Sequence, residues 1–242
     1  MYGKLAPWFH LLTSPDDYEE EAAFYRKAII AAAKARPKTL LELGSGGGNN
    51  ALYMKKYFQM TLSDLSPGML KLSKTINPEL EHKRGDMRTL RLGREFDAVF
   101  IHDAICYMTT EADLRAAIET AFVHTKRGGV ALFAPDYVRE TFELSTHSGG
   151  HDDPKSLRGM RYLEWTFDPE PNDTTYTTEY AFIIRDADGT MRHESDTHVD
   201  GLFSRREWMM FLRDAGFRAK RLPFKHSELE STLEVFVGTR PG

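Results

Sequence analysis

Residues 39–50 read TLLELGSGGGNN, and this stretch decides how the rest of the chain is organised. Its apolar half, residues 39–43, predicts a buried strand of a parallel sheet. Four glycines then fall within five positions and lead into a polar helix start at Asn49. A strand that passes through a glycine-rich turn into a helix brings bare backbone and a helix N-terminus against a ligand. The stretch therefore predicts a ligand site at this turn.

An acidic residue further along the chain indicates that this ligand contains a nucleoside. Asp64 stands at the end of the next apolar segment, residues 60–65, eighteen positions after Gly46. A carboxylate at the end of the strand after such a turn can accept hydrogen bonds from both hydroxyls of a ribose. The alternative is that Asp64, before Leu65-Ser66-Pro67, serves only as a turn residue.

The glycine spacing and Glu42 distinguish between two cofactor classes. A dinucleotide site prefers G-x-G-x-x-G, whereas residues 42–48 read E-x-G-x-G-x-G. A carboxylate at Glu42 repels a pyrophosphate but suits a ligand that carries an ammonium or sulfonium charge. The stretch resembles motif I of the class I S-adenosylmethionine-dependent methyltransferases, and the resemblance continues over most of the chain. The alternatives are a nicotinamide dinucleotide site and a strand-end turn that binds no ligand.

Length and composition predict one domain, residues 1–242, of an ordinary globular protein with 41% hydrophobic and 28% charged residues. A net charge of −4 supplies no basic field that would recruit nucleic acid or an anionic membrane. Cys106 is the single cysteine, which fits a reducing compartment. The sequence contains no apolar run near twenty residues and no signal-peptide pattern, so we expect a cytoplasmic protein without a membrane partner.

Strands and helices alternate regularly through the first half of the chain. This order predicts a doubly wound, mostly parallel α/β sheet with helices on both faces. The expected strands cover residues 39–43, 60–65, 81–86, 96–102 and 130–134, and the expected helices cover residues 15–35, 50–58, 66–76, 110–124 and 204–216. Two final strands, residues 218–224 and 233–238, close the sheet as a hairpin, and this seven-stranded, Rossmann-like ending is implied by the resemblance.

The pattern changes between residues 137 and 203. Residues 136–159 are predicted to be a loop, and three segments rich in aromatic and β-branched residues follow. Those segments, residues 161–167, 174–184 and 190–199, predict an antiparallel insert. Residues 186–189 (DADG) form its expected hairpin turn.

The candidate cofactor site lies at the carboxyl ends of the parallel strands, where open α/β sheets bind ligands. There the family motifs are matched position by position. By this match, Asp86 of the present chain is expected to accept a hydrogen bond from the adenine amino group, and Met87 is expected to pack on the adenine ring. Taken singly, Asp64 and Asp86 are also ordinary turn residues. The resemblance implies that S-adenosylmethionine is bound by Tyr18, Glu42, Gly44, Ser45, Gly46, Asp64, Leu65, Asp86, Met87 and His102.

The N-terminal segment, residues 1–36, corresponds to a lid over the cofactor in the resembled family. Its aromatic residues Tyr2, Trp8 and Tyr18 are candidates for cofactor contact. The alternative is that they are core or surface aromatics.

Methyl transfer requires alignment and a dry pocket, because the sulfonium already activates the methyl carbon. A neutral amine needs no base, whereas a hydroxyl or carbon acceptor does. His102 is the candidate base, with a cofactor contact or a turn cap as the alternative, and Tyr107 is a second candidate catalytic residue. Tyr137, His147 and His151 are weaker candidates for substrate contact. Asp103 and Asp136 make a magnesium site conceivable, but their neighbours do not resemble the metal-dependent subgroup, and we predict no metal.

The second half of the chain resembles small-molecule N-methyltransferases that act on nucleotide-linked amino sugars or on glycine and sarcosine. The resemblance rests on the insert, on G-L-F-S-R-x-x-W at residues 201–208 and on D-A-G-F at residues 214–217. In those enzymes the insert covers the substrate and can mediate a homodimer. We therefore expect a small-molecule amine acceptor and no nucleic-acid partner, since the chain lacks a basic, aromatic-interleaved stripe. The alternatives are a small-molecule O- or C-methyltransferase and a non-catalytic regulator that binds a nucleoside.

Overall fold

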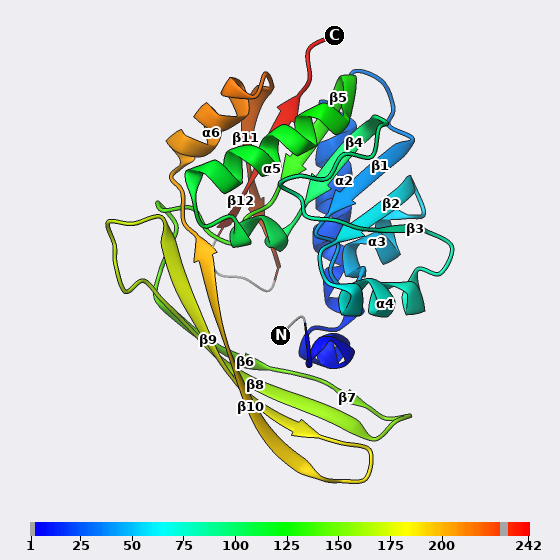
Figure 1. The fold of residues 1–242 in the computed structure, drawn as a ribbon, viewed down its shortest axis with the longest axis vertical. Helices are drawn as coiled ribbons and strands as arrows, with labels where there is room; N and C mark the ends of the chain where they lie inside the picture. The colour runs from blue at the N-terminus through cyan, green and yellow to red at the C-terminus, as the bar shows by residue number, and fades with distance from the viewer. Residues whose placement is uncertain (1–2, 228–231) are drawn as a thin grey trace.

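A seven-stranded sheet forms the larger half of the molecule, in the order β11-β12-β5-β4-β1-β2-β3 (Figure 1). The computed structural model describes residues 3–227 and 232–242. Strands β1 to β5 run parallel, and β12 is antiparallel to both of its neighbours. The predicted mostly parallel sheet and its terminal hairpin are thereby confirmed. The strands are β1 (Thr39–Leu43), β2 (Gln59–Asp64), β3 (Glu81–Arg84), β4 (Phe96–Ile101), β5 (Thr125–Phe133), β11 (Arg218–Lys225) and β12 (Thr232–Thr239).

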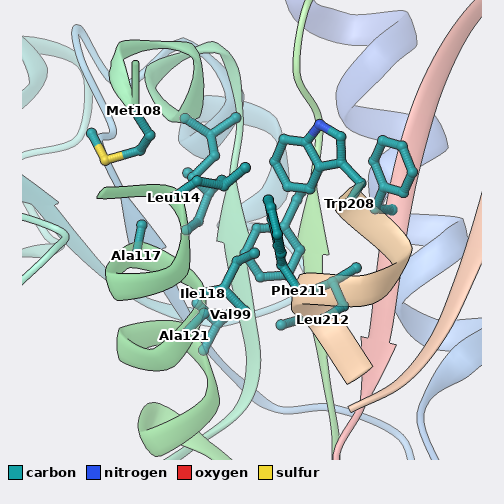
Figure 2. Close-up of a cluster of buried hydrophobic side chains, with 14 of the residues drawn as sticks. Val99, Met108, Leu114, Ala117, Ile118, Ala121, Trp208, Phe211 and Leu212 are labelled. Atoms are coloured by element: carbon teal, nitrogen blue, oxygen red, sulfur yellow. The ribbon is translucent and has the colours of Figure 1, made fainter. Parts of the chain in front are cut away.

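Helices cover both faces of this sheet, which explains why β1 is almost entirely apolar. Leu40, Leu41 and Leu43 are fully buried. Their side chains divide between two cores: Leu40 packs with α2 (Glu19–Ala32) and α3 (Asn49–Met54), and Leu41 and Leu43 pack with α5 (Glu111–His124) and α6 (Arg205–Asp214). Figure 2 shows the second core, where Trp208, Phe211 and Leu212 of α6 approach α5. The remaining helices along the sheet are α4 (Pro67–Ile76) and the 3-10 helix η3 (Asp103–Tyr107).

Asp97 ties the beginning of β1 to β4 at the end of the sheet opposite the glycine turn. Its Oδ2 accepts hydrogen bonds from the backbone amides of Lys38 and Thr39, each at 2.9 Å. Its Oδ1 lies 2.8 Å from Nζ of Lys126. Although partial burial opposes ionisation, Lys126 and these amides lower the pKa of Asp97. The central strands are therefore joined by a charged side chain as well as by the backbone hydrogen bonds between them.

A second, antiparallel sheet extends away from the first (Figure 1). Its strand order is β10-β9-β8-β6, and β7 pairs with β8. The prediction of a loop over residues 136–159 is wrong, because β6 and β7 lie within it. These short strands lack an alternation of apolar and polar residues, so their sequence gives little indication of a strand. β6 lies at the edge of the sheet, where it pairs with β8, and β7 also pairs with β8. The bounds are β6 (Ser145–Gly149), β7 (Asp152–Asp153), β8 (Arg158–Phe167), β9 (Thr175–Arg185) and β10 (Met191–Gly201).

Arg139 joins the beginning and the end of the antiparallel insert. Its backbone amide donates to the carbonyl of Phe203 at 3.1 Å, and its guanidinium donates to the carbonyl of Pro171 at 2.9 Å. The same guanidinium also reaches the carbonyls of Asp173 and Leu202. We call these contacts the Arg139 clamp. They hold together the two segments through which the insert is connected to the large sheet.

The N-terminal segment packs against the insert through Trp8. This segment contains η1 (Ala6–Trp8), α1 (Phe9–Leu12) and η2 (Pro15–Tyr18). Trp8 is 5% exposed and belongs to a core with Met160, Phe182 and Ile184 of the antiparallel sheet. The guanidinium carbon of Arg158 lies 3.7 Å from the centre of the Trp8 ring. A third core therefore fixes the N-terminal segment to the second sheet.

Several predicted boundaries differ from those observed. The helix expected over residues 15–35 is divided into η2 and α2, with a capping box at Ser14. Helix α3 ends at Met54 instead of residue 58, and β5 begins at Thr125 instead of residue 130. A register shift between Phe96 and Ala98 accommodates that longer strand. Within the described residues, no helix combines the length and apolar character needed to cross a membrane.

Candidate active site

A cavity of about 560 Å³ opens at the carboxyl ends of β1, β2 and β4. The glycine turn, η3, the N-terminal segment and one face of the antiparallel sheet all contribute to its wall. The structure thus brings together the cofactor residues expected from the sequence. Its lining includes Tyr18, Glu42, Gly44, Ser45, Gly46, Asp64, Leu65, Asp86, Met87 and His102, together with Tyr107 and Tyr137.

The glycine turn is held in a conformation that excludes a side chain at Gly44. Gly44 has a φ of +72°, and a Cβ there would lie 2.3 Å from Cβ of Ala104 and 2.8 Å from Cε of Met87. The amides of Gly44 and Ser45 both donate to the carbonyl of Ser63, at 2.8 and 2.9 Å. The turn therefore presents bare backbone to the cavity, as a closely approaching ligand requires.

Asp64 is fixed at the cavity wall by the backbone on both of its sides. Its Oδ2 accepts from the amide of Gly46 at 2.8 Å, and its Oδ1 accepts from the amide of Ser66 at 2.8 Å. Burial raises the pKa of Asp64, and these amides partly offset that rise. Each carboxylate oxygen keeps further acceptor capacity. The arrangement orients the carboxylate as a ribose diol would need, and it also braces the glycine turn.

Glu42 offers a buried carboxylate with an oxygen that has no partner. The side chain is 3% exposed, and Oε2 makes no hydrogen bond with the described residues. Burial raises its pKa to about 8, and the positive His102 only partly opposes that rise. A buried acceptor without a donor is costly. The ammonium of S-adenosylmethionine would supply the missing donor, so the residues present fit this cofactor.

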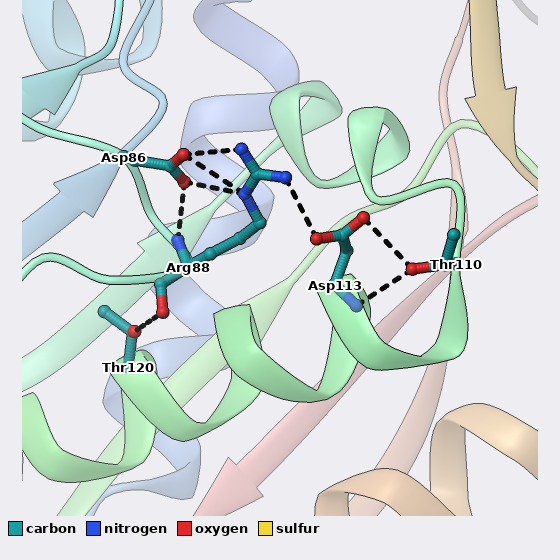
Figure 3. A network of polar contacts seen from close by, with 5 residues as sticks. All are labelled: Asp86, Arg88, Thr110, Asp113 and Thr120. Carbon is teal, nitrogen blue, oxygen red and sulfur yellow. Dashed lines mark hydrogen bonds and ion pairs between the residues drawn. The ribbon is translucent and has the colours of Figure 1, made fainter.

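Asp86 is occupied by Arg88 to a degree that the sequence did not suggest. Nε of Arg88 lies 3.0 and 3.1 Å from the two carboxylate oxygens, and a terminal guanidinium nitrogen lies 2.6 Å from Oδ2 (Figure 3). The other terminal nitrogen donates to Asp113 at 2.9 Å. This pairing lowers the pKa of Asp86. An adenine amino group would have to share oxygens that Arg88 already uses.

His102 carries a charge that does not suit a general base. Its Nε2 lies 2.8 Å from Oδ1 of Asp103 and 3.5 Å from Oε1 of Glu21. Burial favours the neutral ring, but these two carboxylates outweigh burial and raise the pKa of His102 to about 10. An imidazolium at neutral pH has no lone pair for a proton. This geometry runs against the base role predicted for His102 and favours a role in binding or positioning.

Tyr107 also lines the cavity, together with Asp103, Asp136 and Asp200. The Tyr107 hydroxyl lies 2.9 Å from Nδ1 of His198. Confinement in the cavity raises the pKa of Asp136, and the adjacent Asp103 raises it further. Asp200 is 7% exposed. In the part of the chain that the structure describes, no cluster of three or more His, Cys, Asp or Glu side chains has a metal-binding arrangement.

Some candidate residues lie elsewhere. His147 is exposed on β6, and Nε2 of His151 lies 3.3 Å from Oδ2 of Asp17, so neither lines the cavity. Trp8 is buried in the third core instead of facing the cavity. Tyr2 lies outside the described residues.

Eight lining residues from the inner face of the antiparallel sheet were not anticipated from the sequence. They are Tyr162, Glu164, Thr166, Tyr176, Thr178, Tyr180, His198 and Asp200. The alternation of β10 places Asp200 on the same face as His198, and this alternation was a usable signal. The sequence did not show which face of the sheet would be turned toward the cavity.

Comparison with known proteins extends these observations. The profile of a methyltransferase domain family matches residues 40–129. An N,N-dimethyltransferase of dTDP-3-amino-3,4,6-trideoxy-alpha-D-glucopyranose from Streptomyces venezuelae is 28% identical over 208 residues, covering 85% of this chain and 86% of the relative.

Two solved structures are similar over nearly the whole fold. The crystal structure of Streptomyces venezuelae DesVI superimposes with a TM-score of 0.84 at 25% identity, covering 99% of this chain and 98% of that one. CalS10, an amino pentose methyltransferase from Micromonospora echinaspora solved with bound S-adenosylmethionine, gives a TM-score of 0.75 at 25% identity over 92% and 91% of the two chains. Residues 40–129 therefore match a methyltransferase domain, and the glycine turn, Glu42 and the sheet order support a class I S-adenosylmethionine-dependent methyltransferase similar to these relatives.

Proposed function

We propose that this enzyme transfers a methyl group from S-adenosylmethionine to the amine of a small, sugar-like acceptor. The observation that carries the proposal is the continuity of one cavity from the glycine turn to the carboxylates of Asp103, Asp136 and Asp200. The relatives support it, since the Streptomyces venezuelae protein acts on an amino sugar. The cofactor supplies a methyl group that its sulfonium activates for displacement.

The protein's own residues would then bind, orient and handle one proton. Glu42 and Asp64 would hold the amino-acid and ribose parts of the cofactor, and the backbone from Gly44 to Gly46 would lie along it. Residues 1–36 would act as the lid, because His10 Nε2 lies 3.2 Å from the carbonyl of Gly47 on the glycine turn. The lid and the insert would exclude water from the reacting atoms.

An amine that arrives as an ammonium must lose a proton before its nitrogen has a lone pair. Burial raises the pKa of Asp200 to about 7, and Asp103 and Glu164 reinforce the effect. This value lies near the operating pH, as a proton acceptor requires. Asp200 is therefore better suited than His102 to accept the proton.

We further propose a homodimer formed through the outer face of the antiparallel insert, as the resembled enzymes suggest. Leu163, Trp165, Ile183 and Val199 are between 44% and 51% exposed on that sheet. Several large apolar side chains exposed on one sheet are a feature of interaction surfaces. The single, buried Cys106 agrees with the expected cytoplasmic location.

The test of the catalytic proposal uses matched acceptors and isotopically labelled S-adenosylmethionine. Methyl 3-amino-3,6-dideoxy-α-D-glucopyranoside is compared with methyl 6-deoxy-α-D-glucopyranoside, which presents a hydroxyl in place of the amine. We expect labelled methyl groups on the amino sugar only, detected by mass spectrometry. Methylation of the hydroxyl sugar would indicate an O-methyltransferase. Cofactor binding without turnover on either acceptor would favour the regulator.

A further inference from the structure

The acceptor end of the cavity is lined by acidic side chains from four separate parts of the chain. Asp103 comes from η3, Asp136 follows β5, Glu164 lies on β8, and Asp200 lies near the end of β10. These residues line the same cavity as the glycine turn. Carboxyl groups gathered in one cavity make its potential negative, and the ion pair between His102 and Asp103 offsets part of that charge.

Asp200 is the most buried of these four carboxyl groups by exposed area. The side chain is 7% exposed and lines the cavity, and it makes no hydrogen bond within residues 3–227 and 232–242. Asp103 and Glu164 are close enough to disfavour its ionised form. A buried carboxylate without a donor is stabilised by a ligand that brings positive charge and N–H groups. A protonated amine provides both.

The same wall offers nothing to balance a phosphate. Among the described lining residues, Arg88 is the single Lys or Arg, and its guanidinium is shared between Asp86 and Asp113 (Figure 3). His102 is paired with Asp103. Burial lowers the pKa of His198 to about 4, so that ring is neutral at physiological pH. Phosphate recognition in proteins relies on Arg, Lys or helix N-termini, and the acceptor end presents carboxylates instead.

Aromatic rings complete the wall around these carboxylates. Tyr137 and Tyr176 meet edge to face with 5.4 Å between their ring centres, and Tyr180 lies along the same sheet face. Tyrosine rings pack against the apolar faces of sugars and attract ammonium groups through their π-systems.

We propose that the acceptor of this enzyme is a phosphate-free amine, which binds as its ammonium ion against Asp200 between these tyrosines. The inference rests on the proposed amine N-methylation and narrows its substrate class. It separates this chain from the Streptomyces venezuelae N,N-dimethyltransferase named above, whose acceptor is linked to dTDP. A pyrophosphate would bring two like charges into the vicinity of Asp103, Glu164 and Asp200.

Binding calorimetry on the full chain, saturated with S-adenosylhomocysteine, tests this directly. The two probes share one sugar: methyl 3-amino-3,6-dideoxy-α-D-glucopyranoside and the dTDP conjugate of 3-amino-3,6-dideoxy-α-D-glucopyranose. We expect the methyl glycoside to bind at least about 10-fold more tightly, and its affinity to fall as salt increases. Tighter binding of the dTDP conjugate, or binding of neither probe, overturns the inference.

Two substitutions that each remove one negative charge test whether Asp200 binds the methyl glycoside. Asp200→Asn should weaken binding of the methyl glycoside at least about 10-fold and leave the affinity for S-adenosylhomocysteine unchanged. Glu179→Gln is the control, because Glu179 lies on the same sheet but accepts from Thr197 on the outer face. Equal affinities of the Asp200→Asn variant and the unmodified protein would remove Asp200 from the site.

The outcomes also separate this inference from the proposed reaction. If the methyl glycoside binds as expected but is not methylated, the substrate class stands and the N-methyl transfer fails. If the dTDP conjugate binds more tightly and is methylated at its amine, the reaction stands and the phosphate-free acceptor fails.

Discussion

Nε2 of His102 lies 2.8 Å from Oδ1 of Asp103, at the border between the glycine turn and the acidic end of the cavity. Glu21 of α2 approaches the same nitrogen, and Asn50 of α3 lies 3.3 Å from Nδ1. One ring therefore connects two helices to the turn that follows β4. This ion pair places a positive charge beside the carboxylates that would otherwise repel one another.

The His102 ring is expected to stay protonated across the physiological range. Its pKa of about 10 lies above the value of about 6.5 for an unfolded chain. The ion pair therefore contributes stability that is fully present below pH 6.5 and is lost as the pH rises through about 10. NMR of histidine-labelled protein, assigned with His102→Gln, should show no titration of this ring between pH 5.5 and 8.5. A midpoint near 6.5 would contradict the ion pair.

The His102→Gln substitution itself should leave methyl transfer to an amine largely intact. Loss of a general base costs about 10²- to 10⁴-fold in rate. We expect a decrease in kcat of less than about 10-fold, because His102 donates hydrogen bonds and does not accept the proton. A decrease beyond that range would restore His102 as the base.

Cofactor binding at pH 7 should release about one proton from Glu42. The carboxyl is protonated in the free protein, where burial raises its pKa to about 8, and it ionises when an ammonium arrives. Calorimetry of S-adenosylhomocysteine binding in two buffers with different ionisation enthalpies measures that proton. In Glu42→Gln the release should disappear, and binding should weaken by about 1.5–3 kcal/mol. A proton release that persists in the variant would assign it to another group.

Removing the Trp8 side chain should loosen the N-terminal segment. Substitution of a buried tryptophan by alanine costs about 3–5 kcal/mol of packing, and here Trp8 lies beneath Arg158 in the third core. We expect faster hydrogen exchange in residues 5–18 of Trp8→Ala and a weaker affinity for S-adenosylhomocysteine. Trp165→Ala is the matched control, because Trp165 is 48% exposed on the antiparallel sheet against which Trp8 packs. This variant should change neither the hydrogen exchange of residues 5–18 nor the affinity for S-adenosylhomocysteine. Unaltered cofactor affinity in Trp8→Ala would argue against the lid.

Asp97 should stabilise the fold without affecting the site. Asp97→Ala removes hydrogen bonds from Lys38, Thr39 and Lys126 and should lower the free energy of unfolding by about 1.5–3 kcal/mol. Because the pKa of Asp97 is lowered in the folded state, this contribution is present above pH 3.9 and is lost as the pH falls. Urea denaturation at pH 7 and pH 3 measures the difference, which should shrink at pH 3. S-adenosylhomocysteine should bind the variant normally, and impaired binding would mean that the sheet itself had been distorted.

The sequence predicts residues around the glycine turn that the structure brings into one cavity, because the signals for them are local. Glu42 and the glycines adjoin one strand, and Asp64 ends the strand paired with it, so parallel pairing alone brings them together. The charge of His102 depends instead on Glu21, which a helix from the N-terminal segment supplies. Such a contact between distant parts of the chain leaves no periodic pattern in the sequence.

The acceptor half was less accessible to prediction for a related reason. Alternation in β8, β9 and β10 defines two faces, but both contain polar and aromatic residues. The third core and the Arg139 clamp are long-range contacts that help to place the face with Asp200 against the cavity. The edge strands β6 and β7 were missed because pairing with β8, not apolar alternation, makes them strands.

The Arg139 clamp also has an evolutionary consequence. The insert leaves the large sheet after β5 and returns before α6, and Arg139 draws those two junctions together at Phe203. An element whose ends are adjacent can be lengthened, shortened or recombined without changing the strand order that holds the cofactor. Descendants of such a gene can acquire new acceptors by exchanging one segment, while the strand order that carries the glycine turn is inherited unchanged.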